Sequence, residues 1–220
     1  MTITPESVEH LLASEQFSDR LSALNHLRQL EPAVAFRLIR PALTDANVRV
    51  RYAAVSQVAT LGAQDRELAL VLLRDRLIHD PEIDVKAAAA DALSALKLQE
   101  AFGDLEQVYR GTNEWLLQFS IIAALGEMGH PDGFALLAEA LGSQTELVQT
   151  AAITAIGELG DERAVPLLLP FVHHDDWQMR ARTAQSLGNF KTSAPAQEAL
   201  AKLAQDDMEA VAQAAQASLS

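Results

Sequence analysis

Four consecutive side chains, His173, His174, Asp175 and Asp176, supply nitrogen and oxygen donors of the kind that bind divalent metals. Adjacent residues of a chain point in different directions, so these four side chains are poorly placed to coordinate one ion. We therefore predict no metal site. An imidazole titrates near neutral pH. His173 and His174 are therefore kept as candidates for binding a partner or ligand, from a turn that precedes a helix.

Two arginines, Arg49 and Arg182, are candidates for holding a carboxylate. A guanidinium meets a carboxylate through two parallel hydrogen bonds, which gives the contact both strength and direction. Both residues fall outside a series of regularly spaced basic residues to which we assign a structural role below. We expect them to bind a carboxylate of a ligand or of a protein partner.

Four aromatic side chains are candidates for stacking on a flat apolar ligand or for anchoring a partner. They are Tyr52, Phe119, Trp115 and Trp177. Tyr52 and Phe119 share one position of the repeat described below, where many other copies have small residues. Trp115 and Trp177 share another position, two residues before each copy begins. Packing at the start of a helix is the favoured interpretation for the two tryptophans.

No catalytic motif stands out in the sequence. It has no nucleophile with a base at a recognisable spacing, no glycine-rich phosphate loop, no HExxH and no paired carboxylates in a pocket-like context. We assign no catalytic residue and expect a binding protein, although an enzyme is not excluded.

The elements that position these residues come from an internal repeat, which recurs seven times at intervals of 31 to 35 residues. Position zero is most often a branched or large apolar residue, small residues follow at positions three and four, and Leu-like residues follow at positions eight and eleven. Positions zero, four, eight and eleven form one stripe along a helix. The copies begin at Asp19, Val50, Val85, Leu117, Val148, Met179 and Val211.

Each copy predicts a long helix, the B helix, preceded by a shorter A helix such as 67–77, 134–141 or 164–171. The first A helix is expected at 5–14. Glycines at position twelve are expected to end B helices in the left-handed conformation; they are Gly62, Gly129 and Gly160. Polar residues five before position zero are expected to be N-caps; they are Asp45, Asp80, Thr112, Ser143 and Asp206.

Basic residues recur at position one, and we expect them to brace neighbouring repeats through the capping acids. They are Arg20, Arg51, Lys86 and Arg180. Positions two, six and nine should point away from the stacking stripe, and the small residues among them should form the floor of a groove along the B helices.

This pattern predicts an all-α fold, an α-solenoid of about seven HEAT-like helical hairpins, as a single domain over residues 1–220. Tetratricopeptide repeats have a similar period, but their Trp, Gly and Tyr signature is missing from the first helix. Since no polar cap covers the last copy, the pattern also leaves open a homodimer formed through that end.

Composition narrows the functional classes. The chain of 220 residues has a formal charge of −13, which disfavours nucleic acid as a partner because phosphates would be repelled. It has no cysteine, so it offers no disulfide and no thiolate chemistry. No segment approaches about 18 uninterrupted apolar residues and the N-terminus lacks a signal peptide pattern. We expect a cytoplasmic protein without membrane insertion.

Three segments carry a family resemblance: DANVRVRYAAVSQVATLG (45–62), LVQTAAITAIGELGDERAVPLLL (147–169) and DDWQMRARTAQSLG (175–188). They resemble the phycobilisome-lyase-type HEAT repeats of cyanobacteria, over almost the whole chain. The opening segment ITPESVEHLLASEQFSDRLSALNHLRQLEPAVAF (3–36) is most similar to NblB-type phycobilisome degradation proteins, which are relatives of the E/F-type bilin lyases.

The resemblance implies phycobiliprotein subunits or the phycobilisome as partner, and a phycobilin such as phycocyanobilin as a transient ligand that is not bound covalently. It leads us to expect a non-enzymatic accessory protein acting during phycobilisome disassembly or remodelling. Two alternatives stay open: a bilin lyase or isomerase, and a general scaffold for another cyanobacterial assembly pathway.

Overall fold

The computed structural model describes residues 3–220, and within them every regular element is a helix. The chain forms two compact units, one reaching to Ala124 (unit 1) and one comprising Leu125–Ser220 (unit 2). The all-α prediction is confirmed. Residues 1 and 2 of the predicted single domain lie outside the described residues, and a single domain stays a prediction.

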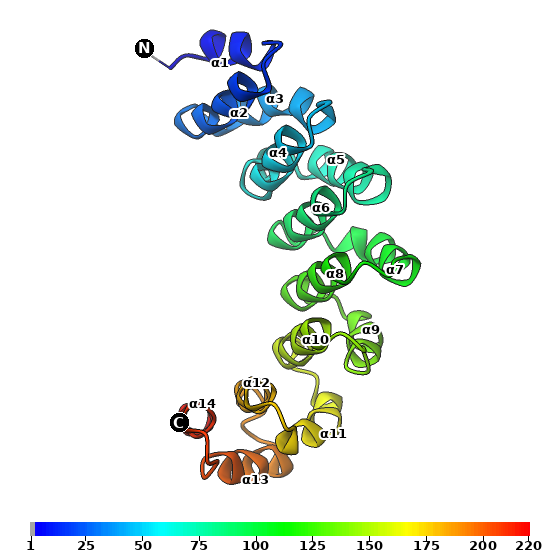
Figure 1. The fold of residues 1–220 in the computed structure, drawn as a ribbon, viewed down its shortest axis with the longest axis vertical. Helices are drawn as coiled ribbons and strands as arrows, with labels where there is room; N and C mark the ends of the chain where they lie inside the picture. Colours follow the sequence, from blue (N-terminus) through cyan, green and yellow to red (C-terminus); the bar gives the residue numbers. More distant parts are fainter. Residues whose placement is uncertain (1–2) are drawn as a thin grey trace. The chain divides into compact units, whose positions relative to one another are not determined.

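Unit 1 contains the first seven α-helices and the start of the eighth (Figure 1). These are α1 (Pro5–Leu12), α2 (Phe17–His26), α3 (Pro32–Ile39), α4 (Val48–Leu61), α5 (Arg66–His79), α6 (Ile83–Ala95), α7 (Phe102–Gly111) and α8 (Trp115–Met128), with 3-10 turns η1 (Leu27–Gln29), η2 (Arg40–Thr44), η3 (Gly62–Gln64) and η4 (Gln99–Ala101) between them. The B helices α2, α4 and α6 pack one on the next, and the A helices α1 and α3, and α5 and α7, are also in contact.

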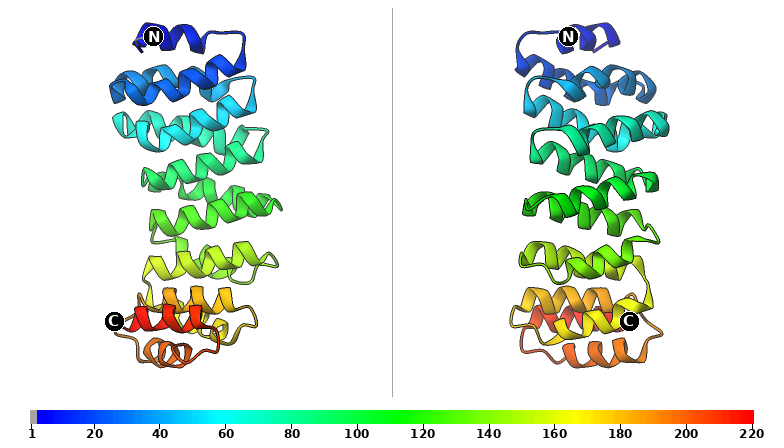
Figure 2. Two further views of the ribbon diagram at one scale, coloured as in Figure 1. Left: turned by 60° about the vertical axis from the view of Figure 1, so that its left-hand side comes forward. Right: turned by 90° about the vertical axis from the view of Figure 1, so that its right-hand side faces the viewer.

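Unit 2 continues the alternation (Figure 2). After the end of α8 come α9 (Gly133–Ala140), α10 (Glu146–Leu159), α11 (Val165–Leu168), α12 (Trp177–Leu187), α13 (Ala194–Leu203) and α14 (Glu209–Leu219), with 3-10 turns η5 (Glu162–Ala164) and η6 (Leu169–His173). The B helices α10, α12 and α14 pack in series. The A helix predicted over 164–171 is broken into η5, α11 and η6, and Pro170, which has no N–H to donate, lies at the second junction.

The apolar stripe forms the core that the repeat predicts. The residue at position four has no exposed surface in any of the seven copies. The same holds for Val50, Val85 and Val148, which stand at position zero. Thr183 is the one polar member of the position-four set, and its hydroxyl donates to the Met179 carbonyl oxygen at 2.8 Å. Burial therefore leaves this hydroxyl satisfied.

Position twelve ends the B helix in the left-handed conformation in three copies. Gly129 and Gly160 have φ of 69° and 70°, as predicted, and Lys97 at the same position has φ of 51°. The prediction for Gly62 is wrong, because it has φ of −64° and continues into η3. Gly62 is required for space instead, since a Cβ there would lie 2.7 Å from Leu96 Cδ1.

Among residues 3–220, each helix is too short or too polar for a transmembrane span.

Candidate functional site

Three arginines at position one join neighbouring repeats, as predicted. Each forms two hydrogen bonds to the aspartate that lies five residues before the next copy. In the most buried pair, Arg51 Nε and NH2 lie 2.8 and 3.0 Å from the two Asp80 carboxylate oxygens. The third nitrogen, NH1, donates to the Asp45 carbonyl oxygen at 2.9 Å. One guanidinium therefore fixes both the loop before its own helix and the loop before the next.

The same geometry recurs once more in unit 1 and once in unit 2. Arg20 pairs with Asp45 at 2.6 Å, and Arg180 pairs with Asp206 at 2.7 Å. We call the three pairs the Arg–Asp brackets. Three other position-one side chains use a single bond to a backbone carbonyl: Lys86 to Ile78 at 2.9 Å, Gln118 to Thr112 at 2.9 Å, and Gln149 to Leu141 at 2.7 Å.

The aspartates of the brackets are not the N-caps that their spacing predicted. The N-cap of α4 is Asn47, two residues after Asp45. Asp45 Oδ1 accepts from the Asn47 N–H at 2.7 Å, and Asp80 Oδ1 accepts from the Glu82 N–H at 3.1 Å. Each aspartate thus forms a short turn that leads into the helix and leaves its carboxylate available to the arginine.

Charge pairing shifts the pKa of these groups. Burial alone would raise the pKa of the Asp80 carboxyl, but the hydrogen bonds from Arg51 and from the Glu82 N–H outweigh it and lower that pKa. The hydrogen bond from Arg180 lowers the pKa of Asp206. The brackets are consequently ionised at neutral pH and serve structure, which leaves the unpaired arginines to be considered for binding.

Position nine does not form a groove floor, which corrects the prediction. In unit 2 it is a glycine at which successive B helices meet, so that a Cβ on Gly157 would lie 2.7 Å from Ser186 Cβ and 3.0 Å from Ser186 Cα. Gly126 approaches Ala155 in the same way, and Gly188 approaches Ser218. Small residues at position nine therefore allow position seven of the next copy to pack closely.

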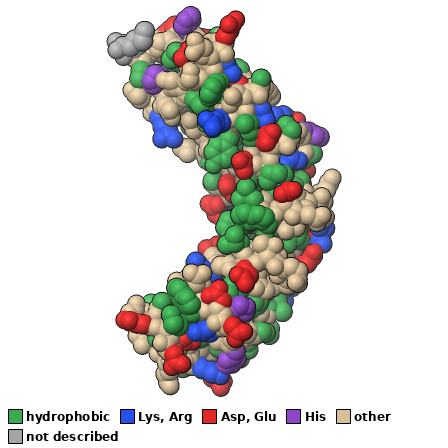
Figure 3. Space-filling model, in the orientation of Figure 1, with side chains coloured by type: hydrophobic (Ala, Val, Ile, Leu, Met, Phe, Trp, Pro, Cys, Tyr) green, Lys and Arg blue, Asp and Glu red, His purple; other side chains and the backbone are tan. Residues whose placement is uncertain are grey.

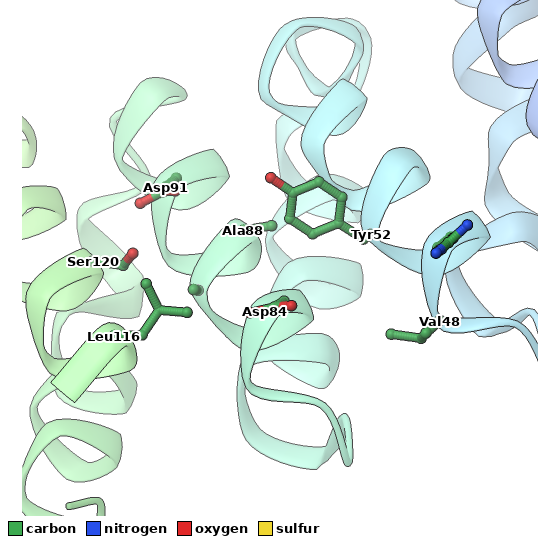
Figure 4. A pocket seen from close by; sticks show the side chains of 9 residues that line it. Val48, Tyr52, Asp84, Ala88, Asp91, Leu116 and Ser120 are labelled. Atoms are coloured by element: carbon green, nitrogen blue, oxygen red, sulfur yellow. The ribbon is translucent and has the colours of Figure 1, made fainter. Parts of the chain in front are cut away.

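A groove with a cavity volume of about 560 Å³ crosses the B helices of unit 1. Such a volume lies within the usual range of ligand sites. It is lined from α4, α6 and α8 by Val48, Arg49, Tyr52, Asp84, Ala87, Ala88, Asp91, Leu116 and Ser120. Tyr52 and Leu116 extend toward α6 from opposite sides (Figure 4). Ala87 and Ala88 are nearly buried and form the floor.

The groove combines apolar walls with separated charges. Arg49 is exposed, and within residues 3–220 no hydrogen bond or ion pair occupies its guanidinium. Asp84 and Asp91 lie seven residues apart on α6, which places them about 10 Å apart along the helix. On the surface of unit 1, hydrophobic side chains likewise lie between acidic and basic ones (Figure 3). A ligand with a flat apolar body, an anionic group and polar N–H groups would match this lining.

Two of the six residues predicted to stack on a ligand or to bind a carboxylate line the groove. Tyr52, with 48% of its surface exposed, and Arg49 line it together. Phe119 is half-buried and is absent from the lining, and Trp115 stands 47% exposed at the start of α8. The packing interpretation of Trp115 does not account for that exposure.

The other candidates lie in unit 2. Trp177 is 39% exposed at the start of α12, and Arg182 is exposed with its NH1 3.0 Å from Gln185 Oε1. His173 Nε2 lies 3.0 Å from Lys202 Nζ, whereas His174 Nδ1 accepts from the Asp176 N–H. The two histidines thus face different partners. Across residues 3–220, no three His, Asp or Glu side chains converge as metal ligands.

Sequence reasoning missed the acidic residues and the α8 side of the groove. Asp84 and Leu116 stand at position minus one, as Arg49 does, and Asp91 stands at position six. Positions minus one, two, three and six share one helix face, because they are three or four residues apart. Asp91 already stood on the expected face, at position six. Reading positions minus one and three in place of position nine would have added Asp84 and Leu116.

Comparison with known proteins places the fold. A family model described as HEAT repeats matches residues 4–94, 70–152 and 135–220. No curated protein sequence matches the chain. The prediction of an α-solenoid built from HEAT-like hairpins is confirmed by the family match and by solved structures of similar fold.

Three solved structures illustrate the likeness. A structure of the complex of CpcE and CpcF of phycocyanin lyase from Nostoc sp. PCC7120 is 21% identical, with TM-score 0.64 over 100% of this chain and 94% of that one. YibA of E. coli is 16% identical, with TM-score 0.69 over 98% and 80%. An archaeal HEAT-like repeats protein from Thermococcus onnurineus is 13% identical, with TM-score 0.58 over 100% and 97%.

Proposed function

Because the chain belongs to the HEAT-repeat family, whose stacked repeats present extended surfaces to partners, we propose that it is a non-enzymatic accessory protein that binds phycobiliproteins. During disassembly or remodelling of the phycobilisome, it contacts a phycobiliprotein subunit and transiently its bilin chromophore. The groove of unit 1 is the contact site.

The observation that carries this proposal is the pairing of Tyr52 with an unoccupied guanidinium, Arg49, over a floor of alanines. An open-chain tetrapyrrole has flat conjugated rings that stack on a phenol ring, and propionates that accept two hydrogen bonds from a guanidinium. Its pyrrole N–H groups are donors, and the Asp84 carboxylate offers acceptors in the same groove. Arg49 and Asp84 thus each have a counterpart on such a ligand.

The choice of a phycobiliprotein as client rests on two supports. One is the sequence resemblance to phycobilisome-lyase-type repeats over almost the whole chain. The other is a fold shared over the length of this chain with a chain from the structure of the CpcE and CpcF complex of phycocyanin lyase. The groove supplies the geometry, and the resemblance supplies the class of client.

A titration tests the proposal. The purified protein is added to phycocyanobilin, free and attached to a phycobiliprotein, while visible absorbance and co-elution on a sizing column are followed. We expect a spectral change and co-elution, with affinity at least about tenfold weaker in Arg49→Ala and Tyr52→Ala, a loss of about 1.4 kcal/mol. Arg163→Ala, which removes an exposed arginine of unit 2 that pairs with Asp161, is the matched control and should bind normally.

The other outcomes identify the alternatives. Co-elution without a spectral change would replace bilin contact with a scaffold role. A bilin whose covalent attachment changes during the incubation would make the protein a lyase or isomerase. Neither co-elution nor a spectral change would remove the proposed function.

A further inference from the structure

One junction of the stack departs from the packing rule of the others. Position nine of one copy faces position seven of the next, and both are small wherever the helices approach closely in unit 2. The same residues are small in the later copies of unit 1. The small pairs are Ala59 with Ala92, Ser94 with Ala124, Gly126 with Ala155, Gly157 with Ser186, and Gly188 with Ser218. The first junction has Arg28 with Gln57 instead.

A cavity of about 360 Å³ lies at this junction. It is lined from η1, from the start of α3 and from the C-terminal half of α4 by Leu27, Arg28, Leu30, Pro32, Ser56, Gln57, Thr60 and Leu61. Bulky polar residues at positions nine and seven prevent the close packing that glycine and alanine permit elsewhere. The cavity is distinct from the groove of unit 1, which uses the N-terminal half of α4.

Three of the four polar side chains that line this cavity are unoccupied, whereas the Ser56 hydroxyl donates to the Tyr52 carbonyl oxygen at 2.9 Å. In the described chain, neither an ion pair nor a hydrogen bond engages the Arg28 guanidinium, and the side chains of Gln57 and Thr60 are likewise unbonded. By contrast, Arg20 and Arg51 on the same two repeats are held in brackets. The apolar walls come from Leu27, which is fully buried, and from the other leucines and the proline of the lining.

We propose that this first-junction cavity binds a small-molecule carboxylate with an apolar body. The guanidinium of Arg28 receives the carboxylate, Gln57 and Thr60 add hydrogen bonds, and the apolar walls cover the hydrocarbon. A single cation matches a single negative charge, and a planar guanidinium matches a planar carboxylate. Because α2 and α4 end beside the cavity, their negative dipole ends do not attract an anion. Affinity must therefore come from Arg28 and the apolar contact together.

The test uses the full chain labelled with nitrogen-15, titrated with octanoate while amide signals of residues 27–32 and 56–61 are followed by NMR. We expect saturable shifts confined to those residues. Octanol, which has the same hydrocarbon chain without the charge, should bind at least about tenfold more weakly. Arg28→Met should weaken octanoate binding by the same factor, whereas Arg163→Met, at an exposed arginine of unit 2 that pairs with Asp161, should leave it unchanged.

A second variant, Thr60→Phe, fills the cavity and should abolish the shifts while Arg28 is retained. The proposal is overturned if octanoate gives no saturable shifts, or if octanol binds as tightly. It is also overturned if inorganic phosphate or N-acetyl-glutamate binds as tightly as octanoate, since the site would then hold any anion or the side chain of a protein partner. Binding here is independent of the groove, so Tyr52→Ala should not change it.

Discussion

The substitution Asp80→Asn isolates what one Arg–Asp bracket contributes to folding. Asparagine has the shape of aspartate and keeps an oxygen that accepts from the Glu82 N–H, but it lacks the charge. The Asp80 side chain is fully buried and that of Arg51 is 9% exposed. The substitution therefore leaves a buried guanidinium without its counter-charge.

The structure sets the expected size of the effect. Asp80 accepts two hydrogen bonds from Arg51, and a further one from Arg76 NH1 at 3.1 Å. Removing one partner of a buried pair typically costs about 3–5 kcal/mol, because the remaining charge is uncompensated. For a chain of this length, each kcal/mol lowers the melting temperature by about 2–4 °C. We expect a decrease in melting temperature of about 6–20 °C.

The assay is thermal unfolding and urea unfolding followed by circular dichroism, with hydrogen exchange to locate the loss. Repeat proteins can unfold in parts, so exchange should increase first at the junction of α4 with α6. Glu106→Gln is the control, because Glu106 pairs with Arg110 on an exposed surface, where such a pair contributes about 0–1 kcal/mol. A destabilisation by Asp80→Asn no larger than that of the control would refute the structural role of the bracket.

Three further predictions concern the same framework. The folded state lowers the pKa of Asp80 below the unfolded value of about 3.9. The difference in unfolding free energy between wild type and Asp80→Asn should therefore be constant at neutral pH and shrink as acid titrates this carboxyl below about pH 4. A difference that grows in acid would contradict this. Gly157→Ala should lower the free energy of unfolding in urea by about 1–3 kcal/mol, because the added Cβ meets the Ser186 backbone. Gly103→Ala is the control: its Cβ meets open space in α7, so the free energy of unfolding should be unchanged or up to about 1 kcal/mol higher. Lys97→Gly should raise the melting temperature, since a left-handed non-glycine residue costs about 1–2 kcal/mol; an unchanged or lower value would show that the lysine conformation is not strained.

The sequence predicted the packing of this protein well because packing repeats. Position four is buried in all seven copies, and the arginines at position one do pair with the acids of the next copy. Because the pattern occurs in seven copies, an exception in one copy does not hide it, and the stacking stripe can be recognised from the sequence alone.

What could not be predicted depended on one-residue offsets. Asp45 was expected at the helix N-cap, but it lies two residues earlier, because its carboxylate closes a turn and pairs with Arg20. Gly62 was expected to be left-handed, yet its backbone continues into a 3-10 turn and its missing side chain makes room for Leu96. A glycine in the sequence does not show which of its two properties is used.

The candidate site was predicted only in part for a similar reason. Tyr52 and Arg49 were found because they break the repeat with chemistry-bearing side chains. Asp84 and Asp91 were missed because acidic residues near helix starts and on exposed faces are common, and their convergence with Tyr52 depends on how α4 and α6 pack. Which helix face lines a groove is a property of the packing between repeats.

The most direct test is co-elution of the protein with a purified phycobiliprotein on a sizing column, comparing wild type, the double variant Arg49→Ala and Tyr52→Ala, and Arg163→Ala. We expect a complex for wild type and Arg163→Ala, and its loss in the double variant while circular dichroism shows unchanged helix content. A complex that the double variant forms as well as wild type would show that the groove of unit 1 is not the binding site.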